Sequence, residues 1–474
     1  MTNPPLLTIA DLIADPVEPA NFPQTILRWR NDRVAEGLGL AMLDESGWIA
    51  AMARFEPLTD NLPQPLALRY HGHQFGHYNP ELGDGRGFTF AQLRDTRGRW
   101  RDLGTKGSGQ TPYSRFGDGR LTLKGAVREL LATEMLTALG VPTSQTLSIV
   151  ETGEQLHRGD EPSPTRSAVL VRASHGHIRV GSFERLSYLD DKAGIERLAR
   201  YALTHLFALD ANEVAAMDAG EVAAALLTRT VGATARTVAA QMVAGFVHGV
   251  LNSDNINVTG ESFDYGPWRF APAWDAGFAA AYFDHGGLYA FGRQPGAVHW
   301  AVGQLAAALR HISEAPPLIE ALEGFAPAYD AAFAKQLCWR LGVSTDTPER
   351  DRALVAAADA WMRGAQTGAE TGTGGLSQID RFFLDWAGGR RPAKATGEAA
   401  ADLASALEGR ADLRGAWWER AAPQGMLIEG VEALWEPIAR ADDWTALDAK
   451  VGAIRAMGAE LASPAPSPMV AAAP

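Results

Sequence analysis

The order of strand-like and helix-like segments along the chain constrains its fold most strongly. A single long helix is predicted in the first part, at 125–139, where apolar side chains recur at helical spacing. From about Gly194 onward the pattern becomes mainly helical. A β-rich first part followed by a helical second part indicates an α+β protein. Alternating apolar residues near glycine-rich turns predict strands over 87–93, 100–106, 146–151 and 167–173.

The same order is that of a two-lobed protein-kinase-like fold, although other α+β proteins share it. The turn formers of Asp95–Gly98 are expected to join two of the strands into a hairpin. Upstream, we expect a short helix over Ile26–Ala35. Two segments have the composition of flexible chain, namely the Gly/Thr-rich stretch 363–378 and the Pro/Ala-rich end from residue 462.

Composition and charge disfavour some classes of partner. The net charge of −13 argues against binding nucleic acid through bulk charge. Cys338 is the only cysteine, so no intramolecular disulfide can form, and its apolar context predicts a buried, unreactive thiol. The N-terminus does not resemble a signal peptide, and no stretch approaches the roughly 20 apolar residues of a membrane span. We therefore expect a cytoplasmic protein that binds neither nucleic acid nor membrane.

Residues 248–266 combine oxygen-bearing side chains with turn formers. Asp254 and Asn255 are adjacent, and Asp264 follows in an Asp-Tyr-Gly triplet. Such oxygen ligands suit a hard cation such as Mg²⁺. In protein kinases, a catalytic-loop Asn and the Asp of an Asp-Phe-Gly triplet hold the metal ions on ATP. Because Asp and Asn are also common turn residues, this segment alone fits a pair of turns equally well.

Three other segments carry cations that suit phosphate. In 82–87, glycines leave backbone N–H groups accessible beside Arg86. Lys106 ends a predicted strand, where a kinase places the lysine that faces ATP phosphates. Arg172 and Arg179 are close enough in sequence to bind one polyphosphate. Taken singly, each has an ordinary alternative, namely a turn, a solvated lysine or surface salt bridges.

A cluster of histidines, His71, His73 and His77, occurs in the glycine-rich part of the chain. Clustered histidines can bind zinc, but a structural zinc site usually takes four ligands, often cysteines, and no further set is at obvious spacing. We therefore expect packing or hydrogen-bonding roles for these histidines.

Seven longer motifs follow one another between about residues 60 and 310. They are GHQFG (72–76), LGDGR (82–86), KGSGQTPYSRFGDGR (106–120), LGVPTSQTLSIV (139–150), SHGHIRVGSFE (174–184), GFVHGVLNSDN (245–255) and FDYGPW (263–268). In order and spacing this set resembles the SelO (YdiU-type) pseudokinases, which act as protein adenylyltransferases. Chance agreement of the whole set is remote.

The resemblance implies a kinase-like fold in which ATP is turned around relative to a kinase, so that its α-phosphate faces the acceptor. The implied reaction transfers AMP to Ser, Thr or Tyr hydroxyls of protein substrates and releases pyrophosphate. The identity of those substrates and the oligomeric state are open at the level of sequence.

By motif position, the resemblance also implies roles for individual residues. Asp254 is the expected base that takes the hydroxyl proton. Asn255 and Asp264 are the expected ligands of Mg²⁺ or Mn²⁺. The residues expected to hold the nucleotide and its phosphates are Gly83, Gly85, Arg86, Lys106, Asp118, Gly119, Arg172 and Arg179.

Two acidic residues of the helix predicted at 125–139 compete as the partner of Lys106. Glu129 occupies the family position, and we keep it because the motif match is ungapped from Lys106. Glu134 lies near the middle of the apolar stripe, and a buried glutamate near Lys106 is a natural partner.

The C-terminal third resembles the family weakly. An Asn-Pro…Arg-Asn motif and a terminal Cys or selenocysteine are common in the family, and neither occurs here. Redox control through a terminal cysteine is therefore not expected. The predicted organisation is an N-terminal extension (1–65), a β-rich nucleotide-binding lobe (66–185), a helical catalytic lobe (186–362), a helical C-terminal extension (363–461) and a disordered tail (462–474).

Two alternative functions are a protein kinase that transfers the γ-phosphate and an inactive ATP-binding scaffold. The extra arginines and the absence of a His-Arg-Asp triplet favour adenylyl transfer over phosphorylation. The complete set of metal-site residues argues against an inactive scaffold.

Overall fold

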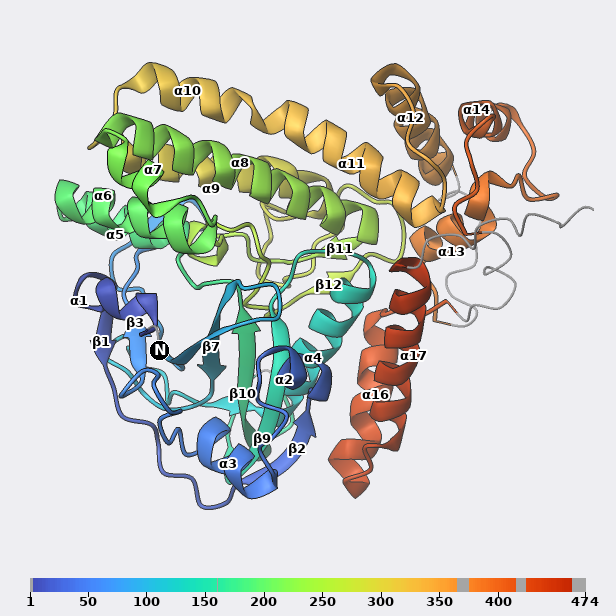
Figure 1. The fold of residues 1–474 in the computed structure, drawn as a ribbon. Coiled ribbons are helices and arrows are strands. Elements are labelled where there is room, and N and C mark those ends of the chain that lie inside the picture. Colours follow the sequence, from blue (N-terminus) through green and yellow to red (C-terminus); the bar gives the residue numbers. More distant parts are fainter. Residues whose placement is uncertain (1–2, 160, 365–374, 415–422, 463–474) are drawn as a thin grey trace, which may run out of the picture.

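The computed structural model describes residues 3–159, 161–364, 375–414 and 423–462. A β-rich lobe built from the first part of the chain lies against a lobe made of helices from the second part (Figure 1). This arrangement confirms the two-lobed, kinase-like α+β fold expected from the order of segments.

One large antiparallel sheet forms most of the β-rich lobe, beside a small two-stranded sheet of β4 (Gly72–Gln74) and β5 (His77–Asn79). Within the described residues the large sheet has eight strands in the order β1-β3-β6-β7-β10-β9-β2, with β8 paired to β10. The two strands β7 and β10 lie in the middle and are almost entirely buried, so the side chains that they carry start from rigid positions. The strands are β1 (Ala14–Pro16), β2 (Ile26–Arg30), β3 (Leu66–Leu68), β6 (Thr89–Arg94), β7 (Trp100–Lys106), β8 (Leu121–Thr122), β9 (Gln145–Leu156) and β10 (Thr165–Ser174).

The strands and the long helix expected in this lobe are confirmed. β6 and β7 form the expected hairpin, whose turn is closed by Gly98 N donating to Asp95 O at 2.8 Å. Helix α4 (Leu123–Ala138) begins after Thr122, whose hydroxyl accepts a hydrogen bond from Gly125 N. Its apolar side chains share a buried core with residues of β9 and β10. The sheet thereby fixes the helix that carries both candidate partners of Lys106.

The helix expected over Ile26–Ala35 is wrong. Residues Ile26–Arg30 form the strand β2, which pairs with β9 at the edge of the sheet. Helix α2 (Asp32–Gly37) starts only after Asn31, whose side chain accepts a hydrogen bond from Val34 N. Pairing with an existing strand gives the backbone groups of β2 their partners, and this tertiary contact overrides the local helical pattern.

The helical lobe is built around α8 (Ala219–Ala244), which is buried along most of its length. A capping box of Asp218 and Glu221 starts α8, and Gly245, in the left-handed conformation (φ 73°), ends it. Two short strands, β11 (Phe246–Val247) and β12 (Arg269–Phe270), enclose the loop that carries the candidate metal ligands. The other α-helices between β10 and α16 in the described residues are α5 (Val180–Tyr188), α6 (Lys192–Tyr201), α7 (Ala211–Ala216), α9 (Gln294–Leu309), α10 (Ala315–Glu323), α11 (Phe325–Leu341), α12 (Pro348–Gly364), α13 (Gln378–Asp385) and α14 (Glu398–Leu407).

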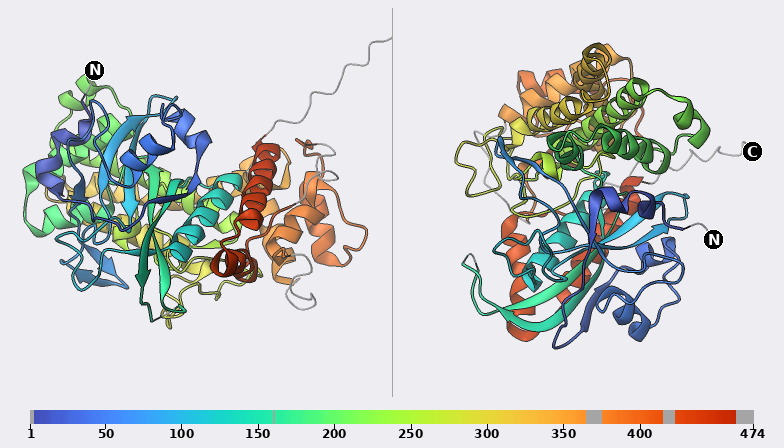
Figure 2. Two further views of the ribbon diagram at one scale, coloured as in Figure 1. Left: turned by 90° about the horizontal axis from the view of Figure 1, so that it is seen from below. Right: turned by 90° about the vertical axis from the view of Figure 1, so that its left-hand side faces the viewer.

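The last two helices, α16 (Ile428–Ala441) and α17 (Thr445–Ala462), return to the β-rich lobe and lie beside α4 (Figures 1 and 2). Of the segments with flexible composition, 365–374 and 463–474 lie outside the described residues. The domain boundaries remain predictions. No helix in the described ranges has both the length and the apolar character that crossing a membrane requires.

We predict that the helical lobe depends on the core around α8. Leu227 is fully buried there, so Leu227→Ala should lower the free energy of unfolding by about 2–5 kcal/mol through lost burial and a residual cavity. The neighbouring Thr228 is exposed, and Thr228→Ala should change the free energy of unfolding by less than about 0.5 kcal/mol. Urea unfolding followed by far-UV circular dichroism measures both, and equal losses would contradict this assignment of the core.

Candidate active site

A cleft of about 690 Å³ is lined by residues of the β-rich lobe and of the loop that carries Asp254 and Asp264. Its volume is typical of sites for small molecules. Seven cationic side chains and four carboxylates line it, which gives this part of an acidic chain a local excess of positive charge. The expected site residues that line the cleft are Gly83, Gly85, Arg86, Lys106, Asp118, Gly119, Arg172, Arg179, Asp254, Asn255 and Asp264.

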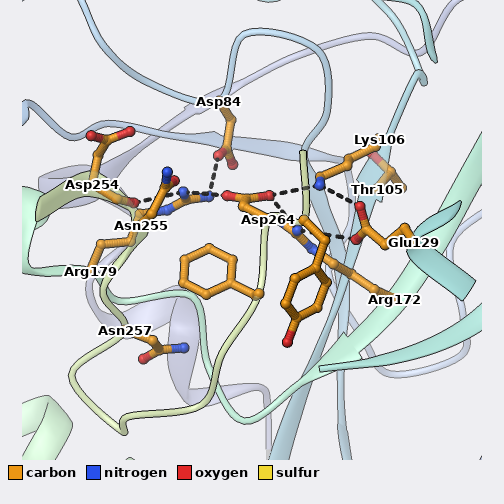
Figure 3. Close-up of polar contacts among 12 residues, drawn as sticks. Asp84, Thr105, Lys106, Glu129, Arg172, Arg179, Asp254, Asn255, Asn257 and Asp264 are labelled. Carbon is orange, nitrogen blue, oxygen red and sulfur yellow. Dashed lines mark hydrogen bonds and ion pairs between the residues drawn. The ribbon is translucent and has the colours of Figure 1, made fainter. Parts of the chain in front are cut away.

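Asp264 is the centre of a buried cluster of charges (Figure 3). Its Oδ1 lies 3.1 Å from Lys106 Nζ and 2.5 Å from Arg172 Nη1, and its Oδ2 lies 2.7 Å from Arg179 Nη1. Burial alone would raise the pKa of Asp264, but Arg172, Lys106 and Arg179 together lower this pKa well below its usual range. Asp264 therefore stays ionised and gathers three cations around one point of the cleft.

The structure pairs Lys106 with Glu129. Lys106 Nζ lies 2.5 Å from Glu129 Oε2, and both side chains are buried. Arg172 Nη1 approaches the other Glu129 oxygen at 3.7 Å. Glu134 instead forms an ion pair with Arg455 of α17. Glu129 lies behind Lys106 rather than in the lining of the cleft, so it orients the ammonium group toward Asp264.

Arg179 is held from several directions, although it is almost completely buried. The rings of Tyr70 and Phe263 lie 4.3 and 4.7 Å from its guanidinium carbon, within the range of cation–π contacts. Its Nη2 pairs with Asp84 Oδ1 at 3.1 Å, and its Nη1 donates to the backbone oxygen of Asp254 at 3.0 Å. Sequence reasoning assigned no role to Asp84, although this residue is the third of the LGDGR motif.

Asp254 differs from Asp264 in its surroundings. It lies in a short 3₁₀ turn, Ser253–Asn255, and its Oδ1 is buried without a hydrogen-bond partner in the described part of the chain. Burial raises the pKa of Asp254 to about 7, against the lowering effect of Arg179, and the charges of Asp264 and Glu184 add to the rise. A carboxyl group with such a pKa can exchange protons near neutral pH.

A network beneath the turn fixes the position of Asp254. Glu184 of α5 uses both carboxylate oxygens, one to accept from Ser253 Oγ at 2.5 Å and the other to contact His73 Nδ1. His73 N also donates to Ser253 Oγ at 2.7 Å. A Cβ atom added at Gly72 would lie 2.9 Å from Asp254 Cβ, so only glycine allows this approach. Sequence reasoning missed Glu184, whose only signal was its place in the SHGHIRVGSFE motif.

The glycines of the cleft allow two loops to pack closely. A Cβ atom at Gly83 would lie 2.3 Å from the Tyr113 ring, and one at Gly85 would lie 2.9 Å from Tyr113 O. Gly119 has φ +70°, and an added Cβ would lie 2.3 Å from the Gly109 backbone. These glycines thus shape the rim formed by residues 82–86 and 109–120.

The charged residues of the rim are far more accessible than the central cations. Arg86 and Asp118 are exposed. Asp118 pairs with Arg158 at 2.9 Å, and sequence reasoning did not single out that arginine. The cleft therefore has a buried cationic end and an exposed mixed-charge rim.

The oxygen atoms beside the cationic end fit a hard cation. Asp254 Oδ1 has no protein partner among the described residues, and Asn255 Nδ2 donates to Val250 O at 3.0 Å, which leaves the Asn255 amide oxygen available. The Asn255 oxygen and Asp264 together form an oxygen-only donor set beside Asp254, of the kind that Mg²⁺ and Mn²⁺ both accept. No three His, Cys, Asp or Glu side chains of the described ranges are grouped to hold a metal, so an ion at Asn255 and Asp264 would need further oxygen ligands, such as those of a bound phosphate.

The fold and the cleft define a kinase-like protein whose site is suited to a phosphate-bearing ligand. The sequence model of the family described as "Protein adenylyltransferase SelO" matches residues 2–381. The protein nucleotidyltransferase YdiU of Synechocystis sp. is 47% identical over 350 residues, which cover 73% of this chain and 72% of the relative. The protein of the same name from Gloeobacter violaceus is 41% identical over 467 residues, covering 95% and 94%. The chain therefore belongs to the SelO family, and it is a nucleotidyltransferase.

We predict that Asp254 makes the protein less stable as pH rises from about 4 to 7. Its pKa is raised in the folded state, so the folded state binds a proton that the unfolded state has released, and stability falls over that range. Asp254→Asn removes this effect. The melting temperature of the variant relative to wild type should therefore be higher at pH 8 than at pH 5, as measured by differential scanning fluorimetry. A difference that does not depend on pH would contradict the raised pKa.

Proposed function

We propose that this chain transfers AMP from ATP to Ser, Thr or Tyr hydroxyls of proteins and releases pyrophosphate. The observation that carries the proposal is the convergence of Lys106, Arg172 and Arg179 at the buried end of the cleft, next to Asp254. Family membership supplies ATP as the expected nucleotide.

The burial of the cationic side chains supports the proposal that ATP binds in the opposite orientation to that in a kinase. A leaving pyrophosphate carries most of the charge that has to be neutralised, and fixed cations in a poorly solvated site do this best. Lys106, Arg172 and Arg179 are all buried, whereas Arg86 at the rim is exposed. We therefore place the β- and γ-phosphates at the buried end and the nucleoside toward the rim.

Asp254 is the proposed base. The acceptor hydroxyl oxygen attacks the α-phosphorus and gives its proton to an Asp254 carboxylate oxygen, while the bond between the α-phosphorus and the oxygen bridging to the β-phosphate breaks. Lys106, Arg172 and Arg179 compensate the charge of the departing pyrophosphate. The Ser253–Glu184 contact keeps the base oriented. A Mg²⁺ or Mn²⁺ ion held by Asn255 and Asp264 would add positive charge at the phosphates when bound.

ATP labelled separately at the α- and γ-phosphates tests the group transferred. With Mg²⁺ and a mixture of soluble proteins as acceptors, we expect protein label from the α position, a mass gain of one AMP, and loss of both on adding EDTA. Asp264→Ala should lose the transfer as well, because it removes the carboxylate that gathers the cations and the proposed metal. Label from the γ position alone would indicate a kinase, and nucleotide binding without any label would indicate an inactive scaffold.

The pH dependence of the rate tests the role of Asp254. A protonated base cannot accept the hydroxyl proton, so kcat/KM should rise with pH and reach half its maximum near pH 7, where the pKa of Asp254 lies. Asp254→Ala should lower kcat by roughly 10²- to 10⁴-fold and remove the rising limb. A profile that keeps the same limb in Asp254→Ala would assign the base to another group.

A further inference from the structure

The C-terminal helix α17 packs along α4, the helix that carries Glu129 (Figures 1 and 2). A Cβ atom added at Gly458 would lie 2.9 Å from Ala138 Cα, so the two helices touch closely at this point. α17 lies beyond residue 381, where the match to the family model ends. Its buried apolar residues share one core with α4 and recur every three or four positions: Leu447, Val451, Ile454, Met457 and Leu461.

Within this interface, Arg455 of α17 forms a bidentate ion pair with Glu134 of α4. The Nε–Oε2 and Nη2–Oε1 distances are 2.8 and 2.7 Å. Asn31, at the end of β2, donates to Glu134 Oε1 at 3.3 Å and accepts from Arg455 Nη2 at 3.1 Å. Because Glu134 is only 8% exposed, it would be a buried unpaired charge without Arg455.

Glu134 and Glu129 are five residues apart on α4, which places them about 140° apart around the helix axis. One side of the helix therefore directs Glu129 to Lys106 in the cleft, while the other directs Glu134 to Arg455. A helix moves as a rigid element, so a contact that fixes one side also fixes the other. In kinase-like folds, the position of the corresponding helix decides whether the lysine–glutamate pair forms.

We propose that Glu134 and Arg455 are positioning residues, and that their ion pair holds α4 where Glu129 reaches Lys106. The C-terminal extension would thus keep the buried end of the cleft in its phosphate-binding arrangement. The activity readout of this proposal rests on the proposed function, whereas its structural readout does not.

The chain offers a matched control on the same extension. Asp442, at the end of α16, pairs with Arg28 of β2 at 2.9 Å and with Arg166 of β10 at 2.7 Å. These contacts join the extension to the sheet and not to α4. Asp442 has φ +54°, a conformation that asparagine also tolerates, so Asp442→Asn weakens the ion pairs without straining the backbone.

The test compares full-length Arg455→Met, Glu134→Gln, the double variant and Asp442→Asn. Hydrogen–deuterium exchange of 123–138, read by mass spectrometry, reports on α4, and steady-state AMP transfer reports on the site. Arg455→Met should speed hydrogen exchange in α4 by roughly tenfold. A change of this size lies within the range of interaction energies measured between residues in contact. The same variant should lower kcat by a similar factor, with a smaller change in the KM for ATP. Arg455→Lys should restore part of the exchange protection of α4 and part of kcat. The double variant should lose less of each than the sum of the losses in the two single variants.

Two outcomes would overturn the proposal. One is Arg455→Met with wild-type exchange in α4 and wild-type kcat. The other is Asp442→Asn with the same increase in α4 exchange as Arg455→Met, because the pair would then serve only to dock the extension. If the wild-type protein transfers no AMP but α4 exchange responds to Arg455→Met alone, the proposed function fails while the positioning role stands.

Discussion

The charges buried around Asp264 impose the constraint on which the rest of the structure depends. Lys106, Arg172 and Arg179 are almost completely buried, and each would be costly to bury without an opposite charge nearby. Asp264 is the carboxylate that all three share. Because the three cations come from β7, β10 and the start of α5, this shared carboxylate joins the sheet, the helical lobe and the Asp-Tyr-Gly loop at one point.

The same cluster separates the two acidic groups of the site by their chemistry. Asp264 is surrounded by cations and keeps a pKa well below the usual range, whereas burial raises the pKa of Asp254 to about 7. The two carboxyl groups belong to one loop, yet one is fixed as an anion and the other can take up a proton. A metal ligand and a base have these different requirements, which suits the roles that we propose for them.

Much of the fold and of the site could be predicted from local patterns and motifs. The hairpin β6–β7, the helix α4 and the helical second lobe follow from periodicity and turn residues. Strand β2 could not be predicted, because its conformation depends on pairing with β9, more than 100 residues later in the sequence. For the same reason Asp84 and Glu184 escaped notice, since their importance lies in contacts with Arg179 and Ser253 that only the folded chain creates.

The sequence by itself determined the family, the two-lobed architecture and the residue types of the cleft, because long motifs and regular periodicity are local properties of the chain. Only the tertiary structure decided which glutamate pairs with Lys106. In sequence, the ungapped motif match indicated Glu129, whereas the apolar stripe of the helix made Glu134 a competing candidate. In the folded chain Glu129 reaches Lys106, whereas Glu134 pairs with Arg455, which lies more than 300 residues away in sequence and packs against the far side of α4. A buried charge needs an opposite charge beside it, and only the folded chain determines which opposite charge lies close enough.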